Sequence, residues 1–104
     1  SAVSVSIISY FELQYGVQNS TNVRQNKTAL NQFLNSIHLI GMDQHAADSS
    51  AVIMADLKKK GTSIGPYDTL IAGIALSQNL ILVSNNLREF ERVEGLSIEN
   101  WLEG

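Results

Sequence analysis

Apolar residues at two different spacings divide the chain into predicted strands and helices. Val3, Val5 and Ile7 alternate with serines, and this period-two pattern rich in β-branched residues predicts a strand. Leu80–Val83 is a continuous apolar run, which is typical of a strand covered on both faces in a parallel sheet. Strands are predicted at residues 3–8, 37–42, 80–83 and 96–101.

Helical spacing dominates the segments between these strands. From residue 21 to about residue 36 the apolar residues fall at i, i+1, i+4 and i+5, which is one face of an amphipathic helix. Asp43 is a good N-cap for a second helix, whose last turn at residues 58–60 carries three lysines that suit the negative end of the helix dipole. Pro66 stands where a first helical residue belongs, and the nearly all-apolar segment after it predicts a buried helix.

The first helix is predicted to begin at Ser9. Ser9-Tyr10-Phe11-Glu12 fits the Ser-x-x-Glu capping box, and Gly16 or the polar residues after it are the expected stop. A further short helix is expected from Asn86, before Gly95. Strands that alternate with helices in this way indicate an α/β fold with a parallel sheet. Residues 1–104 are predicted to form a single domain.

Composition narrows the classes of function. The chain has no cysteine, which excludes disulfides and thiolate metal ligands and makes the cytoplasm the default location. No apolar run approaches the ~18 residues that a membrane span needs. The net charge of −3 would repel a polyanion, which argues against simple nucleic-acid binding.

Three carboxylates stand in similar local settings. Glu12, Asp68 and Glu89 each follow a predicted N-cap by about three residues, so each is expected in the first turn of a helix. Glutamates at this position close capping boxes, and an aspartate there complements the helix dipole. Taken singly, each carboxylate is better explained as part of a helix cap than as a catalyst.

The predicted sheet offers a second interpretation of these carboxylates. Glu12 and Glu89 each follow a strand, and ligands of open parallel sheets bind at the carboxyl ends of the strands. Carboxylates that converge there need a cation to remain ionised, and oxygen ligands without His or Cys suit Mg²⁺ or Mn²⁺. Such a site would activate water against a phosphodiester. His38 and His45 are not at ligand spacing and are interpreted as structural or surface residues.

Several segments of the chain also resemble a known family. They occur in the order of that family and cover nearly the whole chain, and the last is the most specific. The segments are Ser6–Gly16, Gly65–Gly73 and Leu82–Val93, followed by Gly95-Leu96 and Glu99-Asn100-Trp101. They resemble the PIN-domain toxins of bacterial VapBC toxin–antitoxin pairs.

This resemblance implies a fold, an activity and a set of partners. The fold is PIN-like, a three-layer α/β/α arrangement with a mostly parallel sheet. Such proteins are Mg²⁺- or Mn²⁺-dependent endoribonucleases that commonly act on tRNA or other structured RNA, and a small VapB-type antitoxin holds them inactive. The expected partners are the antitoxin, RNA and further copies of the chain as a homodimer or larger assembly. DNA is expected only through the antitoxin, and no membrane is expected.

The resemblance also assigns residues. Glu12 and Asp68 occupy the second and third acidic positions of the family motif. Asn86 stands at the fourth, where many relatives carry aspartate, and Glu89 is the nearby carboxylate that could serve instead. The implied catalytic residues are therefore Glu12, Asp68, Glu89 and Asn86, and the implied metal ligands are Asp68, Glu12 and Glu89.

One departure from the family pattern bears on activity. The family begins with a central strand that ends in the first metal-binding aspartate, followed by a helix, and this sequence contains neither. Without that strand, its neighbours at residues 3–8 and 80–83 would leave unpaired backbone. We therefore expect a domain incomplete at its N-terminus, with the strand supplied by another polypeptide or replaced by a rearranged pairing. Two functions remain open: a ribonuclease toxin, or a catalytically inactive fragment that keeps only the antitoxin-binding or self-association surface.

Overall fold

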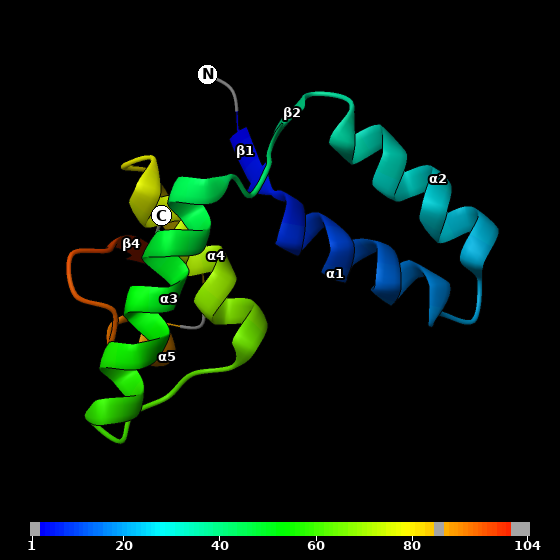
Figure 1. The fold of residues 1–104 in the computed structure, drawn as a ribbon. Coiled ribbons are helices and arrows are strands. Elements are labelled where there is room, and N and C mark those ends of the chain that lie inside the picture. Colours follow the sequence, from blue (N-terminus) through cyan, green and yellow to red (C-terminus); the bar gives the residue numbers. More distant parts are fainter. Residues whose placement is uncertain (1–2, 85–86, 101–104) are drawn as a thin grey trace. The chain divides into compact units, whose positions relative to one another are not determined.

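The computed structural model of the chain describes residues 3–84 and 87–100. Within them, strands and helices follow one another in the order β1-α1-α2-β2-α3-α4-β3-α5-β4 (Figure 1). This is the predicted alternation, and both strand pairs are parallel, which confirms the α/β class. The elements divide between two compact units, residues 1–41 and residues 42–104, here called unit 1 and unit 2.

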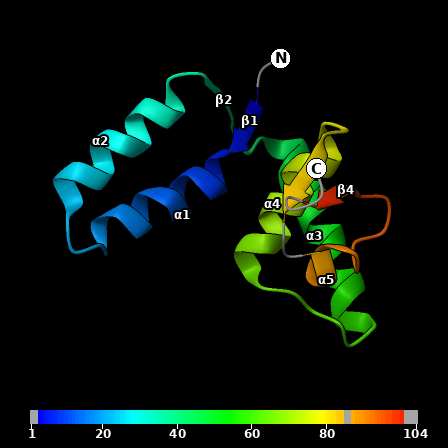
Figure 2. The same cartoon turned by 180° about the vertical axis from the view of Figure 1, so that it is seen from behind.

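Unit 1 contains two strands and a helical hairpin. Strands β1 (Val3–Ser6) and β2 (Ile37–Ile40) pair in parallel, with Val3 opposite Ile37 and Ser6 opposite Ile40. Between them, helices α1 (Ile7–Gln18) and α2 (Val23–Leu34) run side by side, as Figures 1 and 2 both show. The two helices thus form the crossover that a parallel pair of strands requires.

The first helix begins earlier than the sequence pattern predicts. Ser6, not Ser9, is the N-cap: its backbone is extended, and its Oγ accepts a hydrogen bond from the amide of Ser9 at 3.0 Å. The alternation of the strand breaks at Ile7 and Ile8, which together with Phe11 have the i, i+1, i+4 spacing of a helix. The predicted strand is therefore confirmed over residues 3–6 but ends two residues earlier than expected, and the predicted capping box between Ser9 and Glu12 is wrong.

The second helix of unit 1 matches its prediction. Asn22 is the N-cap, with its Oδ1 accepting from the amide of Gln25 at 3.3 Å. Its apolar stripe is only partly covered, since Leu30 and Leu34 are half-buried while Phe33 is exposed. The amphipathic helix is confirmed, with bounds within two residues of those expected.

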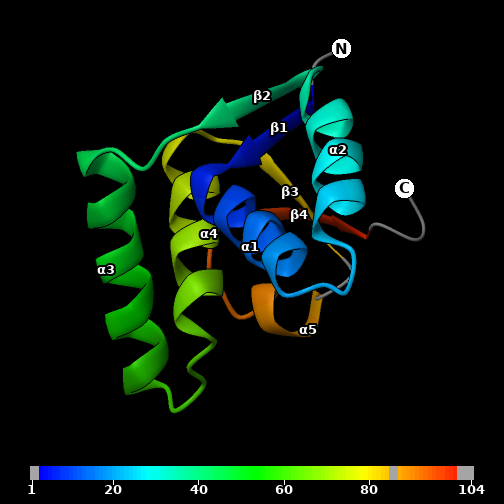
Figure 3. The ribbon, with the colours of Figure 1, turned by 90° about the vertical axis from the view of Figure 1, so that its right-hand side faces the viewer.

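Unit 2 contains two packed helices and a second pair of parallel strands. Helices α3 (Gln44–Lys59) and α4 (Pro66–Ser77) lie side by side in Figures 1 and 3. Strands β3 (Ile81–Ser84) and β4 (Ser97–Asn100) pair in parallel, with Ile81 opposite Ser97. The short helix α5 (Leu87–Phe90) lies between these strands in the sequence.

The predicted caps of the two long helices of unit 2 are confirmed. The side chain of Asp43 accepts a hydrogen bond from the amide of Ala46 at 2.9 Å, and Pro66 is the first residue of α4. Beyond α3, Gly61 takes a positive φ of 70°, a conformation that glycine adopts without steric cost. Both helices therefore begin where local signals place them.

The core of unit 2 lies along α4, as predicted. Ile71, Ala72, Ile74 and Ala75 of this helix are buried, and Leu57 of α3 is buried with them. Strand β3 behaves differently. Ile81 and Val83 are 57% and 48% exposed, whereas Leu82 and Ser84 are half-buried, so the strand packs on one face and the prediction of cover on both faces is wrong.

The strand pairing does not test the prediction that a central strand is missing from this chain. Among the described residues, β1 has β2 as its strand neighbour and β3 has β4, and each sheet contains two strands. The supply of a further strand by another chain stays a prediction. None of the helices in the described ranges is long and apolar enough to cross a membrane.

Candidate functional site

Asp68 lies in the first turn of α4, in a setting built by its neighbours. The N-cap Gly65 is extended, with ψ 152°, and the buried Thr69 donates its hydroxyl to the Gly65 carbonyl at 3.0 Å. Asp68 is half-buried, and a Cβ on Gly65 would lie only 3.8 Å from its Oδ2. The carboxylate is thus held beside the positive end of the α4 dipole, where negative charge is stabilised.

The position of α4 depends on a close approach to α3. A Cβ added to Gly73 would lie 2.9 Å from both the Cβ and the backbone nitrogen of Ser50, and it would overlap the Ser50 hydroxyl. That hydroxyl is buried and donates to the carbonyl of Ala46 at 2.8 Å, so its own position is fixed. Only glycine at residue 73 allows this packing, which holds the helix that carries Asp68.

Arg92 connects the segment after α5 to the loop before α4. Its Nη1 donates to the carbonyl of Ser63 at 3.1 Å, across 29 residues of sequence, and its amide donates to the carbonyl of Glu89 at 3.2 Å. The loop that begins α4 is therefore tied to the segment that carries Glu89. No local pattern in the sequence marks Arg92, because its hydrogen-bond partner lies 29 residues away in the chain.

Glu89 lies in the first turn of α5, as predicted, and is half-buried. Phe90 and Val93, which are 4% and 5% exposed, anchor this short helix and the turn after it in the core of unit 2. Asn86, the other candidate for the fourth acidic position, lies outside the described residues. The predicted capping box between Asn86 and Glu89 lies outside them for the same reason.

Glu12 is placed differently from the other two carboxylates. It is exposed and is the sixth residue of α1, so it is not in the first turn of that helix, which contains no acidic residue. The cap at this helix start is made by Ser6. The interpretation of Glu12 as part of a helix cap is therefore wrong.

The predicted site residues fall in both units. Asp68 and Glu89 belong to unit 2 and Glu12 to unit 1. Within the described ranges, no group of three or more His, Asp or Glu side chains could hold a metal ion. His38 lies on β2 and His45 on α3, and both are exposed, which agrees with their interpretation as surface residues. The convergence of Glu12 with Asp68 and Glu89 stays a prediction.

The lysines at the end of α3 are exposed, as expected for a solvated helix end. Lys60 Nζ lies 3.0 Å from Asp56 Oδ2. The hydrogen bond to Asp56, and then its charge, raise the pKa of Lys60 above its ordinary value of 10.5. Lys58 and Lys59 lie in the last turn, where positive charge stabilises the negative end of the dipole.

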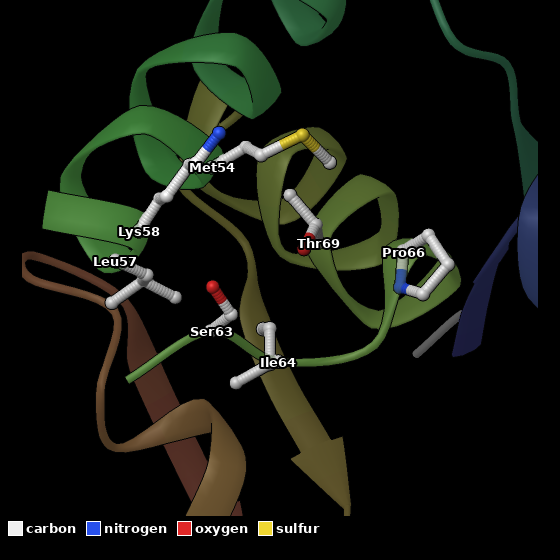
Figure 4. A pocket seen from close by; sticks show the side chains of 7 residues that line it. All are labelled: Met54, Leu57, Lys58, Ser63, Ile64, Pro66 and Thr69. Atoms are coloured by element: carbon white, nitrogen blue, oxygen red, sulfur yellow. The ribbon is translucent and has the colours of Figure 1, made fainter. Parts of the chain in front are cut away.

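A pocket of about 250 Å³ lies in unit 2 between α3 and the loop that leads into α4 (Figure 4). Figure 4 shows Pro66 and Thr69 of α4 on its wall. Successive residues of a helix are rotated by roughly 100°, so Asp68 lies on a different face of α4 from these two residues. The pocket is therefore separate from the candidate acidic site. Its lining residues are Met54, Leu57, Lys58, Ser63, Ile64, Pro66 and Thr69.

Comparison with known proteins gives consistent matches along the chain. The model of the PIN domain family matches residues 1–96. The chain is 42% identical over 101 residues to the tRNA(fMet)-specific endonuclease VapC of Salmonella typhimurium, and the match covers 97% of this chain and 76% of the relative. It is 40% identical to the protein of the same name from Shigella flexneri, covering 93% of this chain and 74% of the relative.

The fold is shared with a solved toxin–antitoxin complex. The crystal structure of VapBC2 from Rickettsia felis, bound to a DNA fragment from their promoter, matches with a TM-score of 0.93 and 37% identity. The match covers 96% of this chain and 75% of the solved chain. The sequence relatives and the structural relative therefore indicate the same group of proteins.

Proposed function

Since the chain belongs to the PIN-domain family, and within it to the VapC ribonucleases, we propose that it is the ribonuclease toxin of a toxin–antitoxin pair. The observation that carries the proposal is the placement of Asp68. This residue of the family motif lies half-buried in the first turn of α4, in the same unit as Glu89. The close packing at Gly73 and the bond from Arg92 to Ser63 hold that turn in position.

The proposed chemistry needs a divalent cation. The candidate ligands offer only carboxylate oxygens, and the chain contains no cysteine, which fits Mg²⁺ or Mn²⁺ better than softer metals. Asp68 and Glu89 would hold the cation. When bound, it would supply a polarised water and neutralise charge on the phosphate. Glu12, which takes no part in the helix cap, would position the attacking water or remove its proton.

The proposed substrate is tRNA and the proposed partner is a VapB-type antitoxin. Two relatives at 42% and 40% identity are named tRNA(fMet)-specific endonucleases, which makes the initiator tRNA the first substrate to test. The structural relative is a complex with an antitoxin on DNA. We propose that this chain likewise meets DNA only through its antitoxin, and that it acts in the cytoplasm.

The test is the substitution Asp68→Asn in the 104-residue chain. Cleavage of purified tRNA(fMet) with Mg²⁺ or Mn²⁺ should fall by at least about 100-fold, because the variant loses a charged oxygen ligand of the cation. The free energy of unfolding should change by less than about 1 kcal/mol, the usual worth of one charge at a helix terminus. Both are measured on the same preparation, by product analysis on gels and by chemical denaturation.

The matched control is Asp56→Asn, which makes the same chemical change in unit 2 at an exposed ion pair outside the proposed site. It should leave cleavage within about twofold of the starting protein, since surface ion pairs contribute little. Equal cleavage by the Asp68→Asn variant and the control would reject the assigned role of Asp68.

A second function is favoured by one observation. In the described ranges, no three acidic or histidine side chains are grouped to hold a metal ion. A chain with too few ligands would act only as a module that binds the antitoxin or another copy. Titration with Mn²⁺ separates the two functions, because a catalytic site should bind the ion saturably with loss of binding in Asp68→Asn. Absence of saturable binding, together with antitoxin binding, would favour the module.

A further inference from the structure

The pocket of about 250 Å³ in unit 2 is apolar along most of its wall. Met54 and Leu57 of α3 line one side, and Ile64 and Pro66 line the other (Figure 4). Leu57 is only 2% exposed, so its position is fixed by the core of the unit. An apolar wall of this kind, with a few polar groups on it, is typical of a small-molecule site.

Three polar side chains complete the lining. The Thr69 hydroxyl already donates to the carbonyl of Gly65 at 3.0 Å. Lys58 and Ser63 are exposed, and the Ser63 hydroxyl points into the space between Leu57 and Thr69 (Figure 4). No carboxylate occurs among the described residues that line the pocket. The polar part of the pocket therefore offers hydrogen-bond donors and one positive charge.

The charge around the pocket favours an anion. Lys60 lies 3.0 Å from Asp56, whereas Lys58 has no carboxylate at ion-pair distance within the described ranges. The wall contributed by α4 is its first turn, which is the positive end of the helix dipole. The wall contributed by α3 is near the negative end of that helix, which Lys58 and Lys59 offset. A bound carboxylate would therefore meet favourable charge at the polar side of the pocket.

The size of the pocket limits its ligand. A cavity of about 150 Å³ holds a benzene molecule, so this pocket has room for roughly ten non-hydrogen atoms. Seven residues line it, far fewer than the roughly 20–30 that each side of a protein interface contributes. The pocket therefore fits a small molecule better than a folded partner.

We propose that this pocket is a binding site for a small apolar carboxylate, such as a medium-chain fatty acid. The alkyl chain lies against Met54, Leu57 and Ile64, and the carboxylate accepts hydrogen bonds from Lys58 and Ser63. The ligand adds contacts to the first turn of α4 without entering the candidate acidic site. Octanoate, with about ten non-hydrogen atoms, is expected to bind with a Kd of about 0.1–1 mM.

Three probes with the same alkyl chain test the ligand class. Octanoate, octanol and octylamine are each titrated into the 104-residue chain, and binding is followed by methyl NMR. Octanoate should shift the methyl signals of Met54, Leu57, Ile64 and Thr69 saturably, and it should bind at least about fivefold more tightly than octylamine. The methyl signals of Val17, which is buried in unit 1, should not shift.

Charge reversal at the pocket tests the role of Lys58. Lys58→Glu should weaken octanoate by about fivefold or more and should strengthen octylamine, because the charge that faces the ligand changes sign. The matched control is Lys59→Glu, which makes the same change in the same turn of α3 but not on the pocket wall. It should leave the affinity for octanoate within about twofold of the starting chain.

A second pair of variants does not rely on charge. Ser63→Phe should abolish binding of both octanoate and octanol, because its ring fills the space into which the Ser63 hydroxyl points (Figure 4). The Ser63 carbonyl that accepts from Arg92 is retained. Ser63→Ala removes only the hydroxyl and should weaken octanoate by no more than about fivefold. Circular dichroism establishes that each variant is folded.

Four results would overturn the proposal. They are the absence of saturable shifts with octanoate, equal affinity for the three probes, unchanged octanoate binding in Ser63→Phe, and equal effects of Lys58→Glu and Lys59→Glu. A pocket that rejects octanoate but whose methyl signals shift when the antitoxin is added would also overturn it, by assigning the pocket to a protein side chain. None of these measurements depends on ribonuclease activity.

Discussion

Helix α4 of unit 2 and helix α1 of unit 1 each carry a proposed site residue, but they are held in different ways. Most residues of α4 from Thr69 to Ala75 are buried, and Gly73 lies against Ser50 of α3. In α1, Val17 is the one buried residue, and Phe11 and Tyr15 are exposed. Helix α4 is therefore held by close packing as well as by its local start signals, whereas α1 buries little of its surface.

This difference affects the proposed chemistry. Asp68 and Glu89 belong to unit 2, where helix packing and the hydrogen bond from Arg92 to Ser63 connect the segments that carry them. Glu12 belongs to the unit with fewer buried apolar residues, Val17 and Ile40 among those described. In both units, we expect substitutions of the proposed site residues to change activity with little effect on stability. We expect substitutions of packed residues to lower stability mainly in unit 2.

The largest expected effect is on activity in unit 1. Glu12→Gln should lower tRNA cleavage by about 10²–10⁴-fold if Glu12 positions or deprotonates the water. Its thermal unfolding should be unchanged, because Glu12 is exposed and makes no cap. Cleavage is measured in single-turnover reactions beside Asp68→Asn. Full activity of the Glu12→Gln variant would confine the chemistry to unit 2.

A pair of glycine substitutions should move stability in opposite directions. Gly73→Ala should destabilise the protein by about 1–3 kcal/mol, because the new Cβ overlaps Ser50. Gly16→Ala in α1 should stabilise it by about 0.5–1 kcal/mol, because a Cβ there meets nothing within 4 Å and alanine favours the helix. Denaturant unfolding measures both.

The glycine pair has an internal control. Ser50→Gly removes the hydroxyl and the Cβ nearest to residue 73, so it should reduce the cost of Gly73→Ala, though not abolish it, since the backbone nitrogen of Ser50 is equally close. If Gly73→Ala and Gly16→Ala had the same effect on stability, the two helices would not differ in packing as described.

A smaller effect is expected at the start of α1. Ser6→Ala should cost about 0.5–2 kcal/mol, because it removes the oxygen that accepts from the Ser9 amide. Ser9→Ala should cost less, because the Ser9 hydroxyl only accepts a hydrogen bond from Ser6 Oγ and does not cap the helix. Thermal unfolding followed by circular dichroism compares them. A larger loss of stability for Ser9→Ala than for Ser6→Ala would indicate that Ser9 caps the helix, as the sequence pattern predicted.

The smallest effect concerns Lys60. The pKa of Lys60 is raised in the folded protein. The stabilisation from its ion pair with Asp56 is therefore not reduced by loss of the lysine proton below pH 10.5, and it is lost as the pH rises through the raised pKa. Asp56→Asn should therefore lower the pKa of Lys60 toward 10.5, as followed by NMR titration. Stability at neutral pH should stay the same within error, because the pair is exposed. If the pKa of Lys60 did not change with this substitution, the assignment of its raised pKa to Asp56 would be wrong.

Much of the local structure follows from signals that lie within a few residues of one another. The N-cap Asp43, Pro66 at the first position of α4, the amphipathic stripe of α2 and the alternation of strands with helices were all predicted, and the structure confirms them. The same kind of local pattern identified the family, through motif segments such as Gly65–Gly73. A cap or a motif depends on neighbours in the chain, so the residues alone reveal it.

The sequence did not distinguish between interpretations that depend on packing. The capping-box pattern predicted a helix start at Ser9, and only the pairing of β1 with β2 as far as Ser6 decided where the strand ends. The contact of Gly73 with Ser50 and the bond from Arg92 to Ser63 join residues more than 20 positions apart. Such contacts depend on which segments the folded chain brings together. For that reason the candidate site residues could be proposed from the sequence, whereas the contacts around Asp68 and Glu89 came only from the tertiary structure.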